Sequence, residues 1–261
     1  MIETAELEPQ EQITSAGAGS QFLVPLLAEV HQDSSQITGL NNDHLGVGGE
    51  KIKDPAENNS IRLINIMGYV VVLSDDPFGS HFIQQKLETA TTTEIVMVYK
   101  EIMPHVRILI IDVFANYAIQ KDVLELGGEF VRSTFAMKFA GRIVDMSCHK
   151  YSSNVIEKCL SVGSCQDRLL IAVEILRAGE DTLLGLMMDQ HGNYVIQKVL
   201  ETAEMWQRDM VVAAATRHVG MLTMYVPGRN VVAQVNKLLT ARGRRAMQFL
   251  SAPTSPLYSH G

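Results

Sequence analysis

The sequence predicts an all-α protein built as a helical repeat solenoid. The first observation is a six-residue signature: a small residue, Ser or Asn, a planar or polar residue, two apolar residues, then Gln or Glu. Its Ser or Asn recurs at steps of 36, 37 and 40 residues, a period typical of solenoids whose units bury apolar faces only against their neighbours. The four copies are Gly79–Gln84, Ala115–Gln120, Ser152–Glu157 and Gly192–Gln197, and a degenerate fifth is Gly228–Ala233.

Turns and helices alternate along the repeats. Each signature follows a short segment that begins with Asp or His and contains an aromatic residue or His, which indicates a tight turn before a helix. The predicted turns are 76–79, 112–115, 149–152 and 189–192. The predicted helices are 61–70, 80–89, 94–109, 116–126, 129–146, 153–162, 166–178, 182–188 and 193–202.

The signature also predicts which side of each helix is buried. Its fourth and fifth residues are apolar, as in Phe82-Ile83 and Val195-Ile196, and they lie away from the polar residues at i and i+4. We therefore expect the apolar pairs in the core. The polar faces of successive units are expected to line up into one continuous strip.

Composition divides the chain into three parts. Residues 1–74 hold ten acidic and three basic residues, and the rest holds 19 of each, so the net charge of −7 comes from the N-terminal part. Residues 1–58 are rich in Glu, Gln, Ser, Gly and Asn, which predicts a disordered acidic segment. The expected divisions are a repeat domain at 59–242, with repeats at about 62–91, 92–128, 129–164 and 165–202 and a degenerate cap at 203–242, and a disordered tail at 243–261.

Several classes of function receive no support from the sequence. Cys148, Cys159 and Cys165 are an odd number without CxxC spacing, which predicts reduced thiols and no metal site. No catalytic motif or cofactor-binding motif is found, so we expect neither an enzyme nor a cofactor. No apolar run is long enough for a membrane span, and the start lacks the features of a secretory signal, so a cytoplasmic protein is expected.

These signatures resemble those of the Pumilio (PUF) family of RNA-binding repeats, over about residues 61–240. The resemblance implies a right-handed, crescent-shaped α-helical solenoid whose inner strip binds single-stranded RNA, one base per repeat. It implies a role in the translation or stability of messenger RNA through 3′ untranslated regions, with protein effectors on the outer face and no DNA partner. Such proteins typically carry about eight repeats, whereas this chain shows four and a degenerate end.

The resemblance also assigns a base to each repeat. Amide side chains at i and i+4 can both donate to and accept from a base edge, whereas Glu only accepts. With RNA antiparallel to the protein, the four repeats spell 5′-UGUA-3′, and His81, Tyr117, Asn154 and Tyr194 stack between bases. The pairs, in RNA order, are Asn193 with Gln197 for U, Ser153 with Glu157 for G, Asn116 with Gln120 for U, and Ser80 with Gln84 for A.

Two other interpretations are open. A polar residue near a helix start can be an N-cap, although capping does not explain the amide or acid four residues later. The chain could also be a helical-repeat scaffold that binds proteins and has weak or lost RNA binding, which its neutral repeat region and reduced repeat number favour. The fifth copy, with Arg229, Asn230 and Ala233, has no reading pair and is expected to cap the solenoid.

Overall fold

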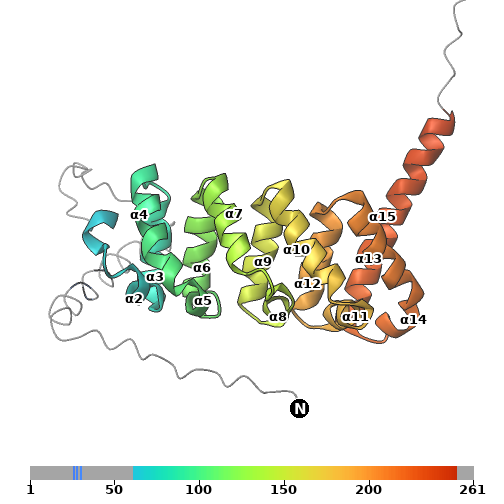
Figure 1. The fold of residues 1–261 in the computed structure, drawn as a ribbon, viewed down its shortest axis with the longest axis horizontal. Coiled ribbons are helices and arrows are strands. Elements are labelled where there is room, and N and C mark those ends of the chain that lie inside the picture. The colour runs from blue at the N-terminus through green and yellow to red at the C-terminus, as the bar shows by residue number, and fades with distance from the viewer. Residues whose placement is uncertain (1–25, 27, 29, 31–60, 252–261) are drawn as a thin grey trace, which may run out of the picture.

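The computed structural model describes residues 26, 28, 30 and 61–251, and every regular element within 61–251 is a helix. The helices stand side by side in one row, from α2 to α4 at one end to α13 to α15 at the other (Figure 1). One hydrophobic core runs along this row and joins all the units. The prediction of an all-α repeat solenoid is confirmed.

Each complete unit contains a short first helix or helical turn, a second helix that carries the signature, and a third helix. Unit A contains one additional helical segment and unit B contains two. Unit A is η2 (Leu63–Ile66), α2 (Val70–Ser74), α3 (Pro77–Leu87) and α4 (Thr92–Ile102); unit B is η3 (Met103–His105), α5 (Val106–Leu109), α6 (Ala115–Ile119), η4 (Gln120–Leu126) and α7 (Glu129–Lys138). Unit C is α8 (Ile143–Cys148), α9 (Ser152–Val162) and α10 (Cys165–Arg177); unit D is α11 (Glu180–Met188), α12 (Gly192–Thr202) and α13 (Met205–Arg217); unit E is α14 (Val219–Leu222) and α15 (Val226–Ser251).

Two long helices predicted from the sequence are broken in the structure. The segment 94–109 is divided by η3, which contains Pro104, and a proline cannot donate the hydrogen bond that would continue a helix. The segment 129–146 is divided between α7 and α8, where Gly141 has a φ of +85°, in the left-handed region that glycine tolerates. Both breaks separate the third helix of one unit from the first helix of the next.

The apolar pairs of the signatures lie in the core, as predicted. Because each pair lies on the side of its second helix away from the polar residues, it packs into the hydrophobic core that runs along the solenoid. The eight residues of the four complete copies are 0–1% exposed: Phe82, Ile83, Ala118, Ile119, Val155, Ile156, Val195 and Ile196.

The small residue that opens each signature lets the second helix approach the first. A Cβ atom on Gly79 would lie 2.3 Å from the carbonyl oxygen of Leu73 in α2, and one on Gly192 would lie 2.9 Å from that of Leu186 in α11. Both distances are far below van der Waals contact. The glycines are therefore required by the tight packing of the first and second helices.

The two predicted flanks differ from the structure where it describes them. Leu26, Ala28 and Val30 are helical, and Val30 is fully buried in the core cluster, whereas the sequence predicted disorder over 1–58. The other residues of 1–58 lie outside the described residues. Helix α15 continues to Ser251, past residue 242 where the sequence placed the end of the domain, and residues 252–261 lie outside the described residues.

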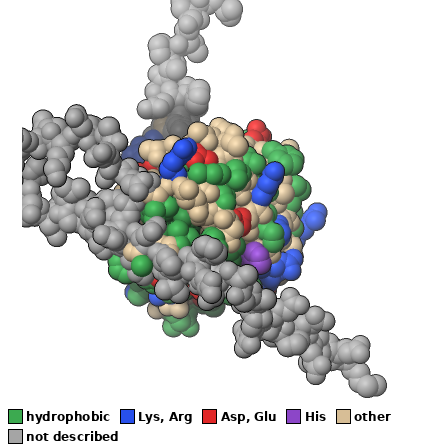
Figure 2. Space-filling view, turned by 90° about the vertical axis from the view of Figure 1, so that its left-hand side faces the viewer, with side chains coloured by type: hydrophobic (Ala, Val, Ile, Leu, Met, Phe, Trp, Pro, Cys, Tyr) green, Lys and Arg blue, Asp and Glu red, His purple; other side chains and the backbone are tan. Residues whose placement is uncertain are grey.

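The N-terminal end of the row faces the viewer in Figure 2. Hydrophobic, basic and other polar side chains are interspersed over its described surface. No described helix is long and apolar enough to cross a membrane. Cys148, Cys159 and Cys165 are free in the structure, and Cys159 is buried.

Candidate nucleic-acid interface

The second helices form a continuous series along the solenoid. Helix α3 contacts α6, α6 and η4 contact α9, α9 contacts α12, and α12 contacts α15. Since each of these helices carries one signature at its N-terminal end, the signatures follow one another in the order of the chain. The structure therefore brings the predicted site residues into one row.

The start of each second helix is fixed by the residue four positions before the Ser or Asn. The Asp76 carboxylate accepts from the Gly79 N–H at 2.7 Å, and Asp112 and Asp189 each accept two backbone N–H groups at 2.7–2.8 Å. In unit C the His149 Nδ1 replaces the carboxylate and accepts from two backbone N–H groups at 3.3 and 3.4 Å. The signature Ser or Asn is thus not the N-cap, and that interpretation is wrong.

The Ser or Asn at the first reading position is buried, which corrects the expectation that it lies on the exposed polar face. Ser80, Asn116, Ser153 and Asn193 are 0–2% exposed. Both amide hydrogens of Asn116 are used within the protein, because they donate to the carbonyl oxygens of Asp112 and Val113 at 2.8 and 3.1 Å. The two hydrogens of Asn193 are used in the same way at 2.9 and 3.1 Å.

Ser80 occupies the same place in unit A but connects two repeats. Its hydroxyl donates to the Phe114 carbonyl of unit B at 2.9 Å. The Ser153 hydroxyl of unit C donates only to the Lys150 carbonyl, at 3.4 Å. The first reading residue is therefore a structural anchor, with stronger bonds at Asn than at Ser153.

The Gln at i+4 is partly exposed and is held by the buried residue. The Gln120 amide nitrogen donates to Asn116 Oδ1 at 3.0 Å, and the Gln197 amide nitrogen donates to Asn193 Oδ1 at 3.0 Å. Gln84 donates to both the hydroxyl and the backbone carbonyl of Ser80, at 3.2 Å each. Among the described contacts, unit C has no equivalent bond between Ser153 and Glu157.

The candidate stacking residues project further from the helices. Tyr117 and Tyr194 are 52% and 51% exposed, and His81 is exposed as well. Asn154 is only partly exposed. Three of the four predicted stacking side chains are therefore open to a planar ligand.

Glu157 is the one acidic residue among the reading pairs. Burial raises the pKa of its carboxyl above the ordinary value, the charge of Lys198 opposes this rise, and the charge of Glu201 adds to it. A partly desolvated carboxylate without an internal donor gains most from a ligand that donates hydrogen bonds to it.

A ladder of lysine and glutamate beside the reading pairs was missed by the sequence reasoning. Lys121 contacts Glu88 of unit A at 3.4 Å and Glu125 at 3.5 Å, Lys158 of unit C contacts Glu125, and Lys198 contacts Glu201 at 2.8 Å. A sequence signal was present, because Lys follows directly after the Gln or Glu in three of the four signatures. These pairs explain how the strip remains neutral although lysines line it.

A pocket of about 380 Å³ lies on the strip. It spans units B, C and D, and it includes Ser161, at the place where unit D carries Glu201. The lining residues are Tyr117, Gln120, Asn154, Glu157, Lys158, Ser161 and Lys198. Four of these seven belong to the predicted site.

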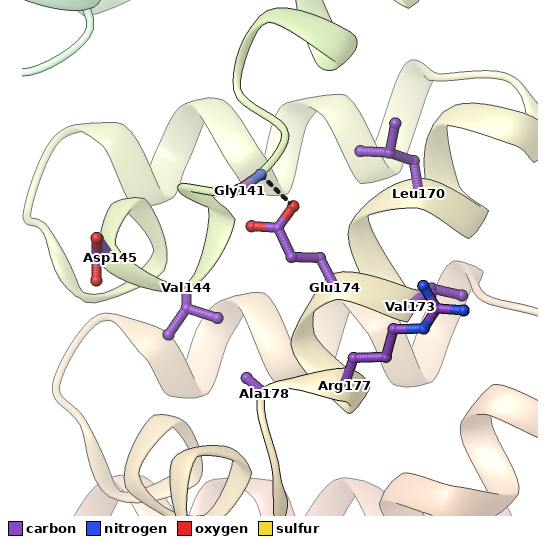
Figure 3. Close-up of a pocket in the computed structure, with 8 residues that line it drawn as sticks. All are labelled: Gly141, Val144, Asp145, Leu170, Val173, Glu174, Arg177 and Ala178. Atoms are coloured by element: carbon purple, nitrogen blue, oxygen red, sulfur yellow. Dashed lines mark hydrogen bonds between the residues drawn. The ribbon is translucent and has the colours of Figure 1, made fainter.

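A second hollow, of about 530 Å³, contains none of the predicted site residues (Figure 3). It lies between α8 and α10 and is lined mostly by apolar side chains, among them Val144, Leu170 and Val173. The Glu174 carboxylate accepts from the backbone N–H groups of Gly141 and Ile143, both at 2.7 Å. This carboxylate ties the third helix to the turn before the first helix, which is a structural role.

The fold and the row of signatures define a helical repeat protein with a polar strip along its second helices. A family model described as "Pumilio-family RNA binding repeat" matches residues 69–103, 142–176 and 183–214. The chain therefore contains three segments that match Pumilio-family repeats. The matches cover units A, C and D, and the signature helix of unit B lies between them.

Curated relatives carry the same family name. The chain is 33% identical to Pumilio homolog 1 of Xenopus laevis over 49% of this chain and 11% of that protein. It is 37% identical to Pumilio homolog 4 of Arabidopsis thaliana over 65% of this chain and 17% of that protein. The chain spans about a third or less of the length of the first curated relatives it matches.

Solved structures of RNA-binding domains share the fold. The Puf3 RNA binding domain bound to Cox17 RNA 3′ UTR recognition sequence site A is 30% identical, with a TM-score of 0.64 over 69% of this chain and 51% of that chain. The same domain bound to site B is 27% identical, with a TM-score of 0.67 over 82% and 52%. The matched family model and these structural neighbours are all described as RNA-binding, which is the class of protein expected from the sequence.

Proposed function

We propose that this chain binds single-stranded RNA along the strip of second helices and reads the core 5′-UGUA-3′, one base per unit from D to A. The observation that carries the proposal is the pattern of hydrogen bonds in the four reading pairs. Units B and D present the same free groups, whereas units A and C each present a different set. Read from unit D to unit A, the core 5′-UGUA-3′ has the same pattern. Its first and third letters, which correspond to units D and B, are identical, and the other two letters differ.

Units B and D suit uracil. Gln120 and Gln197 each use one amide hydrogen on the buried Asn, which leaves one N–H donor and the carbonyl oxygen for a ligand. The Watson-Crick edge of uracil offers one N–H donor flanked by carbonyl acceptors. One glutamine can therefore make two complementary bonds with it.

Unit C suits guanine. Glu157 offers two acceptor oxygens and no donor when ionised. The N1–H and the 2-amino group of guanine are two adjacent donors. The rise that burial causes in the pKa of Glu157 supports this assignment, because the carboxylate has lost water and keeps unused acceptor capacity.

Unit A suits adenine. The Gln84 amide nitrogen is used by the two oxygens of Ser80, so its carbonyl oxygen is the group left for a ligand. The 6-amino group of adenine can donate to this oxygen.

The exposed Tyr117, Tyr194 and His81 would separate the bases. Four stacked bases contribute about 4 to 12 kcal/mol before the cost of ordering the strand.

The proposed biological role is regulation of messenger RNA translation or stability through 3′ untranslated regions in the cytoplasm. Its support is the likeness to Puf3 domains bound to 3′ UTR recognition sequences.

The alternative function is a protein-binding scaffold. It is favoured by exposed apolar side chains on the third helices, such as Phe130 of α7 and Met205 and Trp206 of α13. Such a scaffold would not need ordered reading pairs.

A fluorescence-anisotropy titration with labelled RNA separates these functions. An RNA that contains UGUA is compared with one that contains UCUA, in which cytosine would place ring and carbonyl acceptors against Glu157. We expect micromolar binding of the UGUA strand and at least tenfold weaker binding of the UCUA strand, since one lost charged hydrogen bond is worth about 1.5–3 kcal/mol. Equal or undetectable binding of both strands would contradict base reading and favour the scaffold function.

A further inference from the structure

Helix α15 continues the strip beyond the last reading pair. We infer that its exposed basic face, formed by Arg229, Lys237 and Arg244, binds phosphate groups of the RNA on the 5′ side of the core. This inference rests on the proposed function, because it needs RNA on the strip with its 5′ end toward unit E. It adds a charge contact outside the four units that read bases.

The charge of α15 differs from that of the other second helices. Its sequence contains five basic residues and no acidic residue. On the helices of units B to D, Lys121, Lys158 and Lys198 are each paired with a glutamate. Net positive charge on the strip is therefore concentrated in unit E.

The basic residues share a face with the degenerate signature. At about 100° per residue, Arg229, Ala233, Lys237 and Arg244 fall within about 80° of one another around the helix axis. All four are exposed, whereas Val231 and Val235 on the opposite side are buried against the solenoid. Since Arg229 and Ala233 correspond to the two reading positions, this face is the continuation of the strip.

The side chains on this face are available to a ligand. Within the described part of the chain, no ion pair involves Lys237 or Arg244. Arg229 donates to the Thr223 carbonyl at 3.0 Å, which holds its guanidinium near the start of the helix without neutralising it. The basic residue on the other side, Arg242, is paired with Asp209 of α13.

The position of α15 favours the phosphate backbone as the ligand. The helix packs on α12 through its first half and then extends away from the row of units (Figure 1). Its 26 residues correspond to about 39 Å. A strand that leaves unit D meets a unit with no Gln or Glu at the reading position, so its phosphates, and not its bases, are the groups that Arg and Lys can bind.

RNA strands that differ only in their flanks test the inference on the full chain. UGUA alone, UGUA with a short 5′ oligoadenosine flank and UGUA with the same flank on the 3′ side are titrated at several salt concentrations. We expect the 5′ flank to increase affinity and the 3′ flank to have little effect. The double variant Lys237→Ala with Arg244→Ala should lose most of the gain from the 5′ flank.

Salt dependence gives a second readout. Each phosphate contact on a single strand contributes about 0.7 to the slope of log affinity against log salt, so loss of two contacts should reduce the slope with the 5′-flanked RNA by about 1.4. The matched control is Lys100→Ala with Arg107→Ala, which removes two exposed charges at the other end of the row. The control should keep the gain, and circular dichroism should give the same helicity for both variants.

The outcomes separate this inference from the proposed function. Discrimination of UGUA from UCUA without a gain from the 5′ flank would overturn the phosphate contact and leave base reading intact. The phosphate contact would also be overturned if the α15 double variant kept the increase in affinity from the 5′ flank. The same holds if a 3′ flank increased the affinity equally. Loss of all discrimination between the cores would instead count against the proposed function.

Discussion

Asn193 holds Gln197 in place and is itself buried within the protein. Its two amide hydrogens bind backbone carbonyls at the start of α12, and its oxygen receives the Gln197 amide. The orientation of the glutamine is thus set by a side chain that is 1% exposed. The same division between an anchor and a partly exposed reader recurs at Asn116 and Gln120.

Replacing the anchor should affect stability to different degrees in different units. Asn193→Ala removes three hydrogen bonds at a buried site, two to backbone carbonyls and one from Gln197, so the free energy of unfolding should fall by about 1–3 kcal/mol. Ser153→Ala loses one long bond of 3.4 Å and should lose less than about 1 kcal/mol. Urea unfolding followed by circular dichroism measures both, and equal losses would refute the anchor role of Asn193.

Among individual residues, the sequence predicted the buried apolar pairs, and the side chains proposed to read bases are partly exposed in the structure. It did not predict that Ser80 and Asn116 are buried, because helical periodicity places i and i+4 on one side without showing what covers that side. The carbonyl groups that receive their hydrogen bonds come from the turn or from the next unit, as Phe114 does for Ser80. Such contacts depend on tertiary packing.

Glycines with positive φ lie just before the first helices of three units. Gly68, Gly141 and Gly179 have φ values of +90°, +85° and +96°. Each lies just before a first helix, at equivalent positions of units A, C and D. A glycine in the left-handed backbone region lets the chain change direction there, so that the first helix of the unit can pack beside the helices before it.

Alanine substitutions at two glycines should have opposite effects on stability. Gly141→Ala forces a side chain into the left-handed region and should lower the free energy of unfolding by about 1–2 kcal/mol. Gly185→Ala lies in α11 on an exposed helical site with open space around it, so it should raise that free energy by about 0.4–1 kcal/mol. Thermal or urea unfolding compares them, and stabilisation by Gly141→Ala would contradict this account of the turn.

The sequence placed the second helices of units C and D correctly, within a residue at each end. It merged the third helix with the following first helix in two places, although Pro104 and Gly141 are signals for a break. The division of the unit B helix into α6 and the π-helical segment η4 has no evident signal in residues 115–126. That helix is also outside the segments matched by the family model.

Along the whole molecule, the chemistry of the reading positions alternates. Units B and D offer one donor and one acceptor, unit C offers a carboxylate, and unit A offers a carbonyl oxygen. The lysines beside them are paired, so sequence preference and not bulk charge should govern binding to units A to D. Charge becomes important only at α15.

The repeat period in the sequence was sufficient to predict the solenoid and the order of its units. The ion-pair ladder and the long α15 were not predicted. Overall composition balances 19 acidic and 19 basic residues after residue 74 and does not show where each pair lies. Placement of these charges requires the stacking of neighbouring helices.

The central claim is that each unit reads one base through the residue at i+4, and Glu157→Gln tests it most directly. This variant gives unit C the Ser and Gln combination of unit A, so the second letter of the preferred core should change from G to A. Anisotropy titrations of both proteins with UGUA and UAUA strands measure the change. We expect the original chain to prefer UGUA by about tenfold or more, because a charged hydrogen bond is lost with UAUA, and the variant to prefer UAUA by about 2- to 12-fold, because its hydrogen bond is neutral. Retained preference for UGUA in the variant would contradict the account.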